Sequence, residues 1–438
     1  MKTDARSVSL LTATCLVIAD MIGTGVFTSL GFQVGDLPSG FAIVALWTLG
    51  GICALCGALS YAELAAALPR SGGEYHLLGT IYHPAVGFLA GWISATVGFA
   101  APIALAAMAF GKYLGPLAPT LPPALLSFAG LWVPTLLLLA GSRVGSRFLN
   151  AATLLKIALI VAVIVAAFAT GPAEAIRFRP AASDVRLLTS GPFALSLVYV
   201  MYAYSGWNGS VYIAGELRDP TRTLPRALGL GTALVMLLYV ALNAAFLHRT
   251  PIAELTGKVE VGLIAGTHIF GPAGARIMAG LIGTGLVSAI AAMMWTGPRV
   301  TTTMGEDHRA LAWLTPRTGA GVPARAILFQ AAIATALLLT GSFARVLTYV
   351  QFSLLACSFA TVLGVFVLRR TQPALPRPYR TWGYPFTPLV FLAISAWMMA
   401  HVVRSSPLES LAGLATMAVG LLVYFLSPAT TGRTNSHP

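Results

Sequence analysis

The sequence is poor in charge and in the motifs of soluble enzymes. Only 9% of its 438 residues are Asp, Glu, Lys or Arg, and 14 of them are acidic. A soluble globular domain usually carries about 25% charged residues. The chain has no Gly-x-x-x-x-Gly-Lys-Ser/Thr run, which excludes a P-loop nucleotide site. It also has no Gly-x-Ser-x-Gly elbow, which argues against a hydrolase of that type.

Cysteine and histidine are also scarce, with four and seven residues. Cys15, Cys53, Cys56 and Cys357 all fall within apolar runs. The Cys53-x-x-Cys56 spacing resembles a redox pair, but it lies outside any soluble fold, and we interpret it as packing. No histidine stands at metal-binding spacing from Cys, Asp or Glu. We therefore expect no metal, no cofactor and no enzymatic activity.

Long apolar runs dominate the chain. Hydrophobic residues make up 57% of it, and the mean hydropathy is +0.81. A helix needs about 20 apolar residues to cross a bilayer. These observations predict one all-α transmembrane domain over residues 1–438, with twelve spanning helices joined by loops near 171–190, 248–265 and 298–322. The apolar runs cover residues 9–33, 41–68, 85–114, 121–141, 147–170, 191–215, 225–247, 266–297, 323–341, 345–368, 384–403 and 409–427.

The net charge of +13 is informative about orientation. With the N-terminus inside, 17 Lys and Arg residues fall on the cytoplasmic side and 9 on the outer side, and Lys156 falls within a span. Basic residues concentrate in cytoplasmic loops. We therefore expect a plasma or inner membrane protein with both termini in the cytoplasm, attracted to anionic membrane lipids. Nucleic acid is not an expected partner, because the chain has no soluble basic face.

The first apolar run contains the unusual segment IADMIGTGVF, Ile18 to Phe27. A carboxylate, Asp20, and two glycines, Gly23 and Gly25, stand near the middle of this predicted span. In hydrocarbon, a broken helix is tolerated only where protein or a water-filled cavity meets the freed backbone groups. The glycines permit such a break and the close approach of a ligand. Tight packing of two helices at the glycines is the alternative.

Such a break has two chemically different sides. The half-helix that begins near Phe27 points its positive end at the gap, which suits a carboxylate. The half-helix that ends near Ile22 leaves free carbonyl groups, which suit an ammonium. One break can therefore hold both charges of a zwitterion.

A second irregular segment lies in the sixth run, FALSLVYVMYAYSGWNGSVYIAGE, whose middle from Tyr202 to Asn208 is aromatic, polar and glycine-containing. The first and sixth runs are equivalent if the chain has two five-span repeats, about 9–170 and 191–368, followed by two helices at about 384–427. Interrupted segments at corresponding positions of two halves indicate the binding site of a transporter. Two six-span halves are the alternative, which the positions of the breaks disfavour.

Four segments in order resemble the amino acid–polyamine–organocation superfamily, especially bacterial amino acid permeases and the light subunits of heteromeric amino acid transporters. They are IADMIGTGVF, SYAELAAALPRSGGEY, YSGWNGSVYIAGELRDPTRTLPRA and TPRTGAGVPARAILFQ. The resemblance implies a LeuT-type fold, with a five-plus-five inverted repeat and broken helices 1 and 6. It also implies alternating access around a site between spans one, three, six, eight and ten.

The resemblance further implies which residues bind substrate. Thr24 and Gly25 would hold the substrate carboxylate through a hydroxyl and a backbone N–H. The carbonyl groups of Met21, Tyr202 and Ser205 would hold the α-ammonium. The ring of Tyr202 would also act as a gate over the substrate, with an ordinary packing aromatic as the alternative.

The far end of the expected site is polar but uncharged. Asn208 falls where related proteins place a polar residue near the substrate amino group or side chain, although an intramembrane amide can also bridge two helices. Gly206, Gly209 and Ser210 provide small neighbours. Because the centre of the sixth span has no carboxylate, we expect neutral L-amino acids. A transporter of cationic amino acids or polyamines is the alternative.

Lys156 is the most unusual charged residue. It stands nine residues after Arg147, roughly 13 Å into the membrane, where a lysine costs about 2.5–3.5 kcal/mol on insertion scales. In sodium-independent relatives, a lysine of the fifth span fills the place of a sodium ion. By this resemblance Lys156 would bridge carbonyls of Ile18–Ile22 and a hydroxyl such as Ser288 or Thr284, and transport would need no sodium. Snorkelling to the interface is the alternative.

The acidic residues receive more ordinary roles. We interpret Asp20 as an ion-pair partner of Lys156 or a helix cap, with a proton carrier as the alternative. Glu216 is interpreted as an ion pair or cap at the cytoplasmic end of the sixth span. The remaining charges form an expected inner gate network in cytoplasmic loops and helix ends, with Glu63, Arg70, Glu74, Asp219 and Arg222.

Together these features predict a secondary active amino acid transporter, acting as an exchanger or as a proton symporter. A transceptor of the same fold is the main rival, and an ion channel or an intramembrane enzyme has less support. No outer-loop cysteine is available for a disulfide to a heavy subunit, so no obligatory heavy subunit is expected.

Overall fold

The computed structural model describes residues 8–139, 146–171, 177–318, 322–341, 343–405 and 407–427. Within these ranges every regular element is a helix. Four basic residues of the expected cytoplasmic side, Lys2, Arg6, Arg143 and Arg433, lie outside the described residues.

The described ranges contain eight helices that are long and apolar enough to cross a membrane. The count is nine if α10 (Ala182–Leu188) and α11 (Gly191–Ala203), which are bent by 66°, form one span. Three shorter apolar helices are α8 (Pro123–Leu139), α16 (Ala324–Leu339) and residues Ser410–Leu426 of α19 (Pro407–Leu426). The chain is therefore a multi-pass membrane protein.

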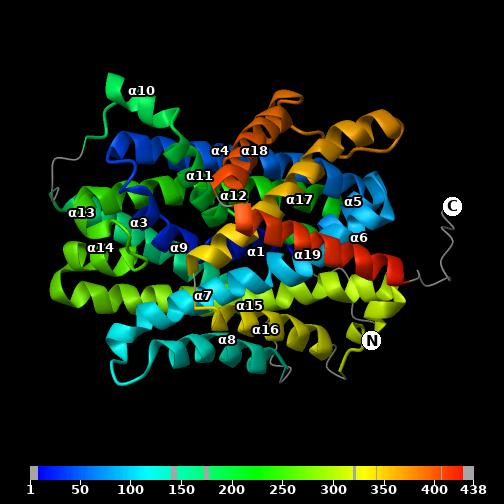
Figure 1. Cartoon of the computed structure of the whole chain (residues 1–438), viewed down its shortest axis with the longest axis horizontal. Coiled ribbons are helices and arrows are strands. Elements are labelled where there is room, and N and C mark those ends of the chain that lie inside the picture. Colours follow the sequence, from blue (N-terminus) through cyan, green and yellow to red (C-terminus); the bar gives the residue numbers. More distant parts are fainter. Residues whose placement is uncertain are drawn as a thin grey trace.

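Several of the longest helices extend along the long axis of the molecule. They include α4 (Gly40–Ala67), α12 (Pro220–Arg249) and α15 (Gly274–Asp307) (Figure 1). The hydroxyl of Ser39 caps α4 by accepting a hydrogen bond from the Ala42 N–H at 3.3 Å. Other elements are α9 (Ser146–Ala169), α17 (Phe343–Thr371), α18 (Phe386–Ser405), α13 (Ile252–Leu255), α14 (Val261–Phe270), η2 (Gly115–Leu117), η4 (Gly271–Ala273) and η5 (Arg309–Leu314).

Parts of the three expected loops are helical. α10 lies in the first, α14 begins within the second, and α15 continues to Asp307 within the third. In the polar end of α15, threonine hydroxyls bond to carbonyls of the preceding turn, as Thr302 does to Pro298 at 2.7 Å, so these buried polar groups have partners within the helix. Its Arg299 also pairs with Glu216 at 2.7 Å.

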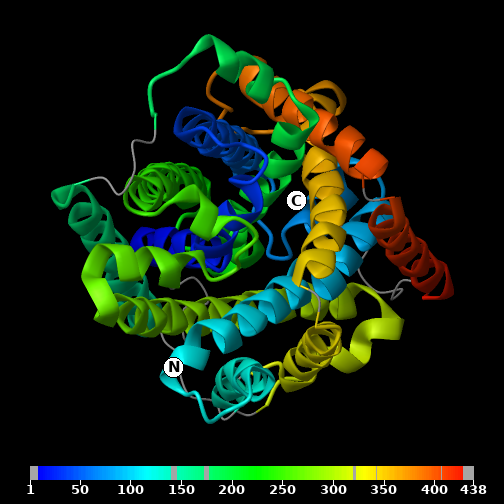
Figure 2. The same ribbon diagram turned by 60° about the vertical axis from the view of Figure 1, so that its left-hand side comes forward.

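The first apolar run lies at the centre of the bundle. α1 (Leu10–Met21) contacts α9, α12, α15 and η3 (Gly209–Glu216), and Figure 2 shows it between α12 and α15. Most of its side chains are buried. α11 packs against α4 and against α2 (Gly25–Thr28), which α3 (Leu30–Gln33) follows. The two irregular segments therefore meet inside the protein.

Glu63 does not belong to an exposed gate network. It is buried in α4, with its carboxylate 2.7 Å from Arg369 and 3.6 Å from Arg377. It also accepts a hydrogen bond of 2.6 Å from the Thr381 backbone N–H. This ion pair fixes the end of α17 and the following segment against α4.

Candidate substrate-binding site

The first helix is broken at the predicted glycines. α1 ends at Met21, and α2 begins at Gly25. A Cβ atom added at Gly25 would lie 2.4 Å from the Ala203 Cα, whereas one at Gly23 would meet nothing within 4 Å. Gly25 therefore allows the two interrupted segments to touch, and Gly23 faces open space.

The sixth run is broken at the predicted aromatic segment. α11 ends at Ala203, and η3, a 3-10 helix, begins at Gly209. Gly206 between them has φ +97°, a conformation that favours glycine. A Cβ atom there would lie 2.7 Å from the backbone carbonyl carbon of Asp20. The two breaks thus face each other, backbone against backbone.

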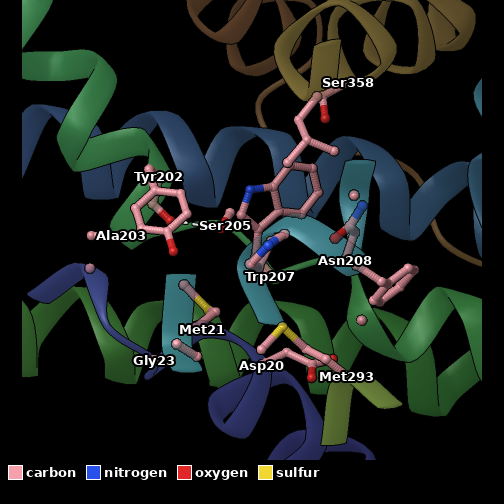
Figure 3. A pocket seen from close by; sticks show the side chains of 18 of the residues that line it. Asp20, Met21, Gly23, Tyr202, Ala203, Ser205, Trp207, Asn208, Met293 and Ser358 are labelled. Atoms are coloured by element: carbon pink, nitrogen blue, oxygen red, sulfur yellow. Dashed lines mark hydrogen bonds between the residues drawn. The ribbon is translucent and has the colours of Figure 1, made fainter. Parts of the chain in front are cut away.

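A cavity of about 100 Å³ lies between the two breaks (Figure 3). Eight of the nine residues predicted to bind substrate line it: Met21, Gly23, Thr24, Gly25, Tyr202, Ser205, Gly206 and Asn208. Ile22 lines a second cavity, together with Lys156. The break in the first run therefore has one side toward each cavity.

The predicted carboxylate end is closed by a direct hydrogen bond. The Thr24 and Tyr202 hydroxyls are 2.9 Å apart, and both residues are buried. The Tyr202 carbonyl already accepts bonds from the Ser205 N–H (3.0 Å) and hydroxyl (2.7 Å). The Met21 carbonyl accepts a bond of 2.6 Å from the Tyr239 hydroxyl. Two of the three carbonyl groups predicted to hold an ammonium, those of Met21 and Tyr202, thus already accept hydrogen bonds within the protein.

The remaining wall was not predicted residue by residue. It comes from one turn of π-helix, η1 (Ser94–Gly98), and from α7 (Ala100–Leu114), α15 and α17, through Gly98, Phe99, Pro102, Ala106, Met293, Leu354 and Ser358. Short π-helical turns are frequent at functional sites. In Figure 3 the labelled Ser358 lies on the far side of Trp207 from Asp20 and Met293.

Glu74 is a further residue of this cavity, which the sequence analysis assigned to a gate network of cytoplasmic loops and helix ends. It is buried at the first position of α5 (Glu74–Ile81) and lines the cavity. Its Oε1 accepts hydrogen bonds from the Tyr61 hydroxyl, the Asn208 side-chain amide (3.4 Å) and the Ser358 hydroxyl (3.4 Å). Burial raises the pKa of Glu74 to about 7, although these hydrogen bonds oppose the rise.

Two glycines explain why the side chain of Glu74 is buried within the protein. Gly72 has φ +113° and Gly73 has φ +58°, so the chain reverses just before α5. A Cβ atom at Gly73 would lie 2.2 Å from the ring of Tyr212. The Ser-Gly-Gly-Glu-Tyr sequence was the available signal, since paired glycines mark a tight turn.

Lys156 contacts the broken helix as predicted. Its Nζ donates a hydrogen bond of 2.8 Å to the Ile22 carbonyl. The expected second partner is not bonded to it among the described residues. The Thr284 hydroxyl bonds to the Gly280 carbonyl of its own helix at 2.6 Å, and the buried Ser288 hydroxyl has no hydrogen bond. Ser288, Thr284 and Lys156 nevertheless line one further cavity.

Asp20 lines the cavity between the two breaks and has no direct partner among the residues that the structure describes. Neither carboxylate oxygen makes a hydrogen bond to the described part of the chain, and both are buried. A Cβ atom at Gly209 would lie 2.2 Å from its Oδ2. Lys156 acts on Asp20 electrostatically, but the expected ion pair does not form among the described residues at 4.0 Å or less.

The other predicted gate residues form two separate contacts. Arg70 pairs with Asp307 at 3.0 Å, and the Tyr75 hydroxyl donates to the same carboxylate at 2.8 Å. Asp219 and Arg222 form an exposed pair at 3.7 Å. Across the described ranges, no group of three or more His, Cys, Asp or Glu side chains is arranged to hold a metal ion.

Most of the chain is similar in sequence to known proteins. The chain is 28% identical over 433 residues to the Asc-type amino acid transporter 1 of Mus musculus, covering 96% of this chain and 81% of that protein. It is 29% identical to the large neutral amino acids transporter small subunit 2 of Oryctolagus cuniculus, over 434 residues, 96% of this chain and 80% of that one.

A third relative is the b(0,+)-type amino acid transporter 1 of Mus musculus, with 26% identity over 430 residues, 96% of this chain and 88% of that protein. The amino acid permease family matches residues 8–427. The predicted superfamily, and the prediction of a transporter rather than an enzyme, are confirmed by these matches. The chain belongs to the amino acid permease family.

Proposed function

We propose that this permease is a sodium-independent secondary transporter that prefers neutral L-amino acids. The observation that carries the proposal is the cavity between two broken helices, lined by eight of the residues predicted to bind a zwitterion. The three relatives are all named as amino acid transporters, which supports the same substrate class.

The cavity offers separate partners for the two substrate charges. The Thr24 hydroxyl and the Gly25 backbone N–H, at the start of α2, would hold the carboxylate. An incoming carboxylate would break the 2.9 Å bond between Thr24 and Tyr202 and free the tyrosine hydroxyl. The ammonium would use the Ser205 carbonyl. It would also use the Met21 and Tyr202 carbonyls by displacing one of the two hydrogen bonds that each oxygen already accepts.

Sodium independence is supported by the contact between Lys156 and Ile22. The ammonium occupies a carbonyl oxygen at the break, and such oxygens are the ligands that a sodium ion would need. Its positive charge also repels a second cation. Uptake into vesicles should therefore be unchanged when choline replaces sodium, and a collapse of uptake would contradict the proposal.

The architecture that we propose has twelve spans. The long candidates, the bent pair and the three shorter apolar helices of the described residues together supply that number. They would form a five-plus-five inverted repeat over about 9–170 and 191–368, with two further helices at about 384–427. The excess of basic residues on one side supports cytoplasmic termini in an inner membrane.

We expect function without an obligatory heavy subunit. A disulfide to a partner needs an accessible thiol, whereas Cys15, Cys53 and Cys357 are buried and Cys56 is half-buried within α4. A purified single chain should therefore transport by itself. A requirement for a second protein in the vesicle would overturn this expectation.

Counterflow in proteoliposomes tests the function. Vesicles that contain the purified chain are loaded with one unlabelled amino acid, and the entry of trace labelled alanine or leucine is followed without sodium. Entry that is stimulated by internal neutral amino acids, and not by arginine, is the expected result. If no amino acid stimulates entry, the chain is a sensor of the same fold or carries a different substrate.

A further inference from the structure

Glu74 is a buried acid in the wall of the substrate cavity, and the proposed function does not use it. Four elements converge on it: α4 through Tyr61, α5 itself, the broken sixth run through Asn208, and α17 through Ser358. A carboxylate placed where helices of both proposed repeats meet can sense their relative movement. The burial of the Glu74 carboxylate at this meeting point therefore needs a physical explanation.

The described residues supply no counterion for the charge of Glu74. Within the described ranges, no Lys, Arg or His side chain lies within 4.0 Å of it, the distance at which ion pairs form here. The titratable groups around it are Tyr61, Tyr212 and Cys357, which are neutral in their ordinary forms. A buried charge is unfavourable unless it is paired and hydrogen-bonded.

The hydrogen bonds of Glu74 support two protonation states. All three donors that the structure gives it reach Oε1, whereas Oε2 makes no hydrogen bond among the described residues. The ionised form is stabilised by those donors, and the protonated form keeps them and carries its proton on Oε2. Neither form requires a rearrangement of the neighbouring side chains.

Asp20, the other acid of this cavity, has different electrostatic surroundings. Lys156 is near enough to act on its charge, so the positive charge of the ammonium offsets that of an ionised Asp20. Asp20 and Lys156 together are therefore close to neutral without a mobile ion. In the described part of the chain Glu74 has no such neighbour, so a proton is the cation that we infer balances it.

We propose that Glu74 is a proton-binding site in the substrate cavity and that its protonation couples proton entry to amino acid uptake. This inference rests on the proposed transport function. The proton would come from water at the outer side through the cavity to Oε2. It would leave to cytoplasmic water when the turn at Gly72 and Gly73 moves with α5. One proton crosses with one neutral substrate, and no other bond forms or breaks.

The test uses the purified full chain in empty proteoliposomes with the membrane potential clamped at zero. Labelled alanine uptake is measured with an inward gradient of one pH unit. One-to-one coupling should concentrate the substrate about tenfold, because one pH unit corresponds to a tenfold ratio. Glu74→Gln should reduce this ratio to about one, relative to counterflow measured in the same preparation.

Two further variants keep the test decisive. Glu254→Gln makes the same change at an exposed position and should keep the tenfold ratio. Tyr61→Phe removes one donor to the carboxylate, so the pH at half-maximal uptake should rise, even if Glu74→Gln fails to fold. An unshifted midpoint in Tyr61→Phe would contradict the proposal.

The outcomes separate the two proposals. Tenfold accumulation by Glu74→Gln would overturn the role of Glu74, as would loss of accumulation in Asp20→Asn alone. Wild-type counterflow without any proton-driven accumulation would overturn the coupling and leave the transport function standing. Absence of wild-type counterflow would overturn both.

Discussion

Gly25 provides a sharp test of the contact between the two broken helices. In Gly25→Ala, the new Cβ atom would lie 2.4 Å from the Cα and 2.6 Å from the Cβ of Ala203. Carbon atoms pack at about 3.5–4.0 Å, so the segments must separate by about 1 Å or more. The atoms in the way belong mainly to the backbone of Ala203, which cannot move aside by changing a rotamer.

Two opposing effects set the size of the change. Alanine is favoured over glycine within a helix by roughly 0.5–1 kcal/mol, which would stabilise α2. Overpacking of a filled core costs about 1–3 kcal/mol and occasionally more. The steric effect is larger, and we expect Gly25→Ala to be destabilised by about 1–2 kcal/mol and to lose counterflow.

Thermal unfolding in detergent measures the loss of stability, and counterflow in vesicles measures the loss of transport. Gly23→Ala is the matched control, because its Cβ atom would meet nothing within 4 Å. It should unfold like the wild type, while its methyl group in the substrate cavity weakens transport. If Gly25→Ala unfolds at the wild-type temperature and transports normally, the segments do not touch as described.

Four further results are expected. Lys156→Ala should lose sodium-free uptake, measured in choline, because the Ile22 carbonyl loses its 2.8 Å partner. Tyr202→Phe, which loses the bond to the first break, should weaken substrate binding by about 0.5–1.5 kcal/mol in a titration of counterflow. Glu63→Gln should lower the stability in a detergent melt by about 3–5 kcal/mol, since it breaks a buried ion pair. Asp219→Asn, which breaks an exposed pair, should change the stability by about 0–1 kcal/mol. The pKa of Glu74 rises from 4.5 to about 7 on folding, so the folded state binds more protons than the unfolded state between these pH values. The free energy of unfolding should therefore decrease by about 3 kcal/mol as the pH rises from 4.5 through 7. Melts of Glu74→Gln should lack this decrease.

The breaks could be predicted because their chemistry is local. Glycines beside a threonine or an aromatic cluster are conspicuous in a span, and a lysine deep in a span must find an oxygen nearby. The depth of Lys156 indicated that it needs a partner, and the family resemblance implied that the partner is a carbonyl of the first span, such as that of Ile22. The bounds of α15 did not follow, because its polar end is held by contacts that hydropathy does not report.

Glu74 could not be placed from sequence for a different reason. Its neighbours in the chain are polar, and hydropathy assigned it to a loop. Its partners Tyr61, Asn208 and Ser358 are 13, 134 and 284 residues away, so their convergence is a property of the tertiary fold. The positive φ angles at Gly72 and Gly73 turn the chain inward, and glycine pairs alone do not give the direction of a turn.

The contact of Lys156 with the Ile22 carbonyl has a mechanical consequence. Ile22 lines the cavity of Lys156, and the next residue, Gly23, lines both that cavity and the substrate cavity. Lys156 therefore holds the unwound backbone from the side opposite the substrate cavity. Rewinding of the helix would require the hydrogen bond between Lys156 and the Ile22 carbonyl to break. The substrate meets a backbone that is already unwound, so less of its binding energy is lost to ordering the site. Under the proposed sodium-independent mechanism, a covalently attached cation would take the place of a dissociable ion that otherwise has to arrive before each substrate.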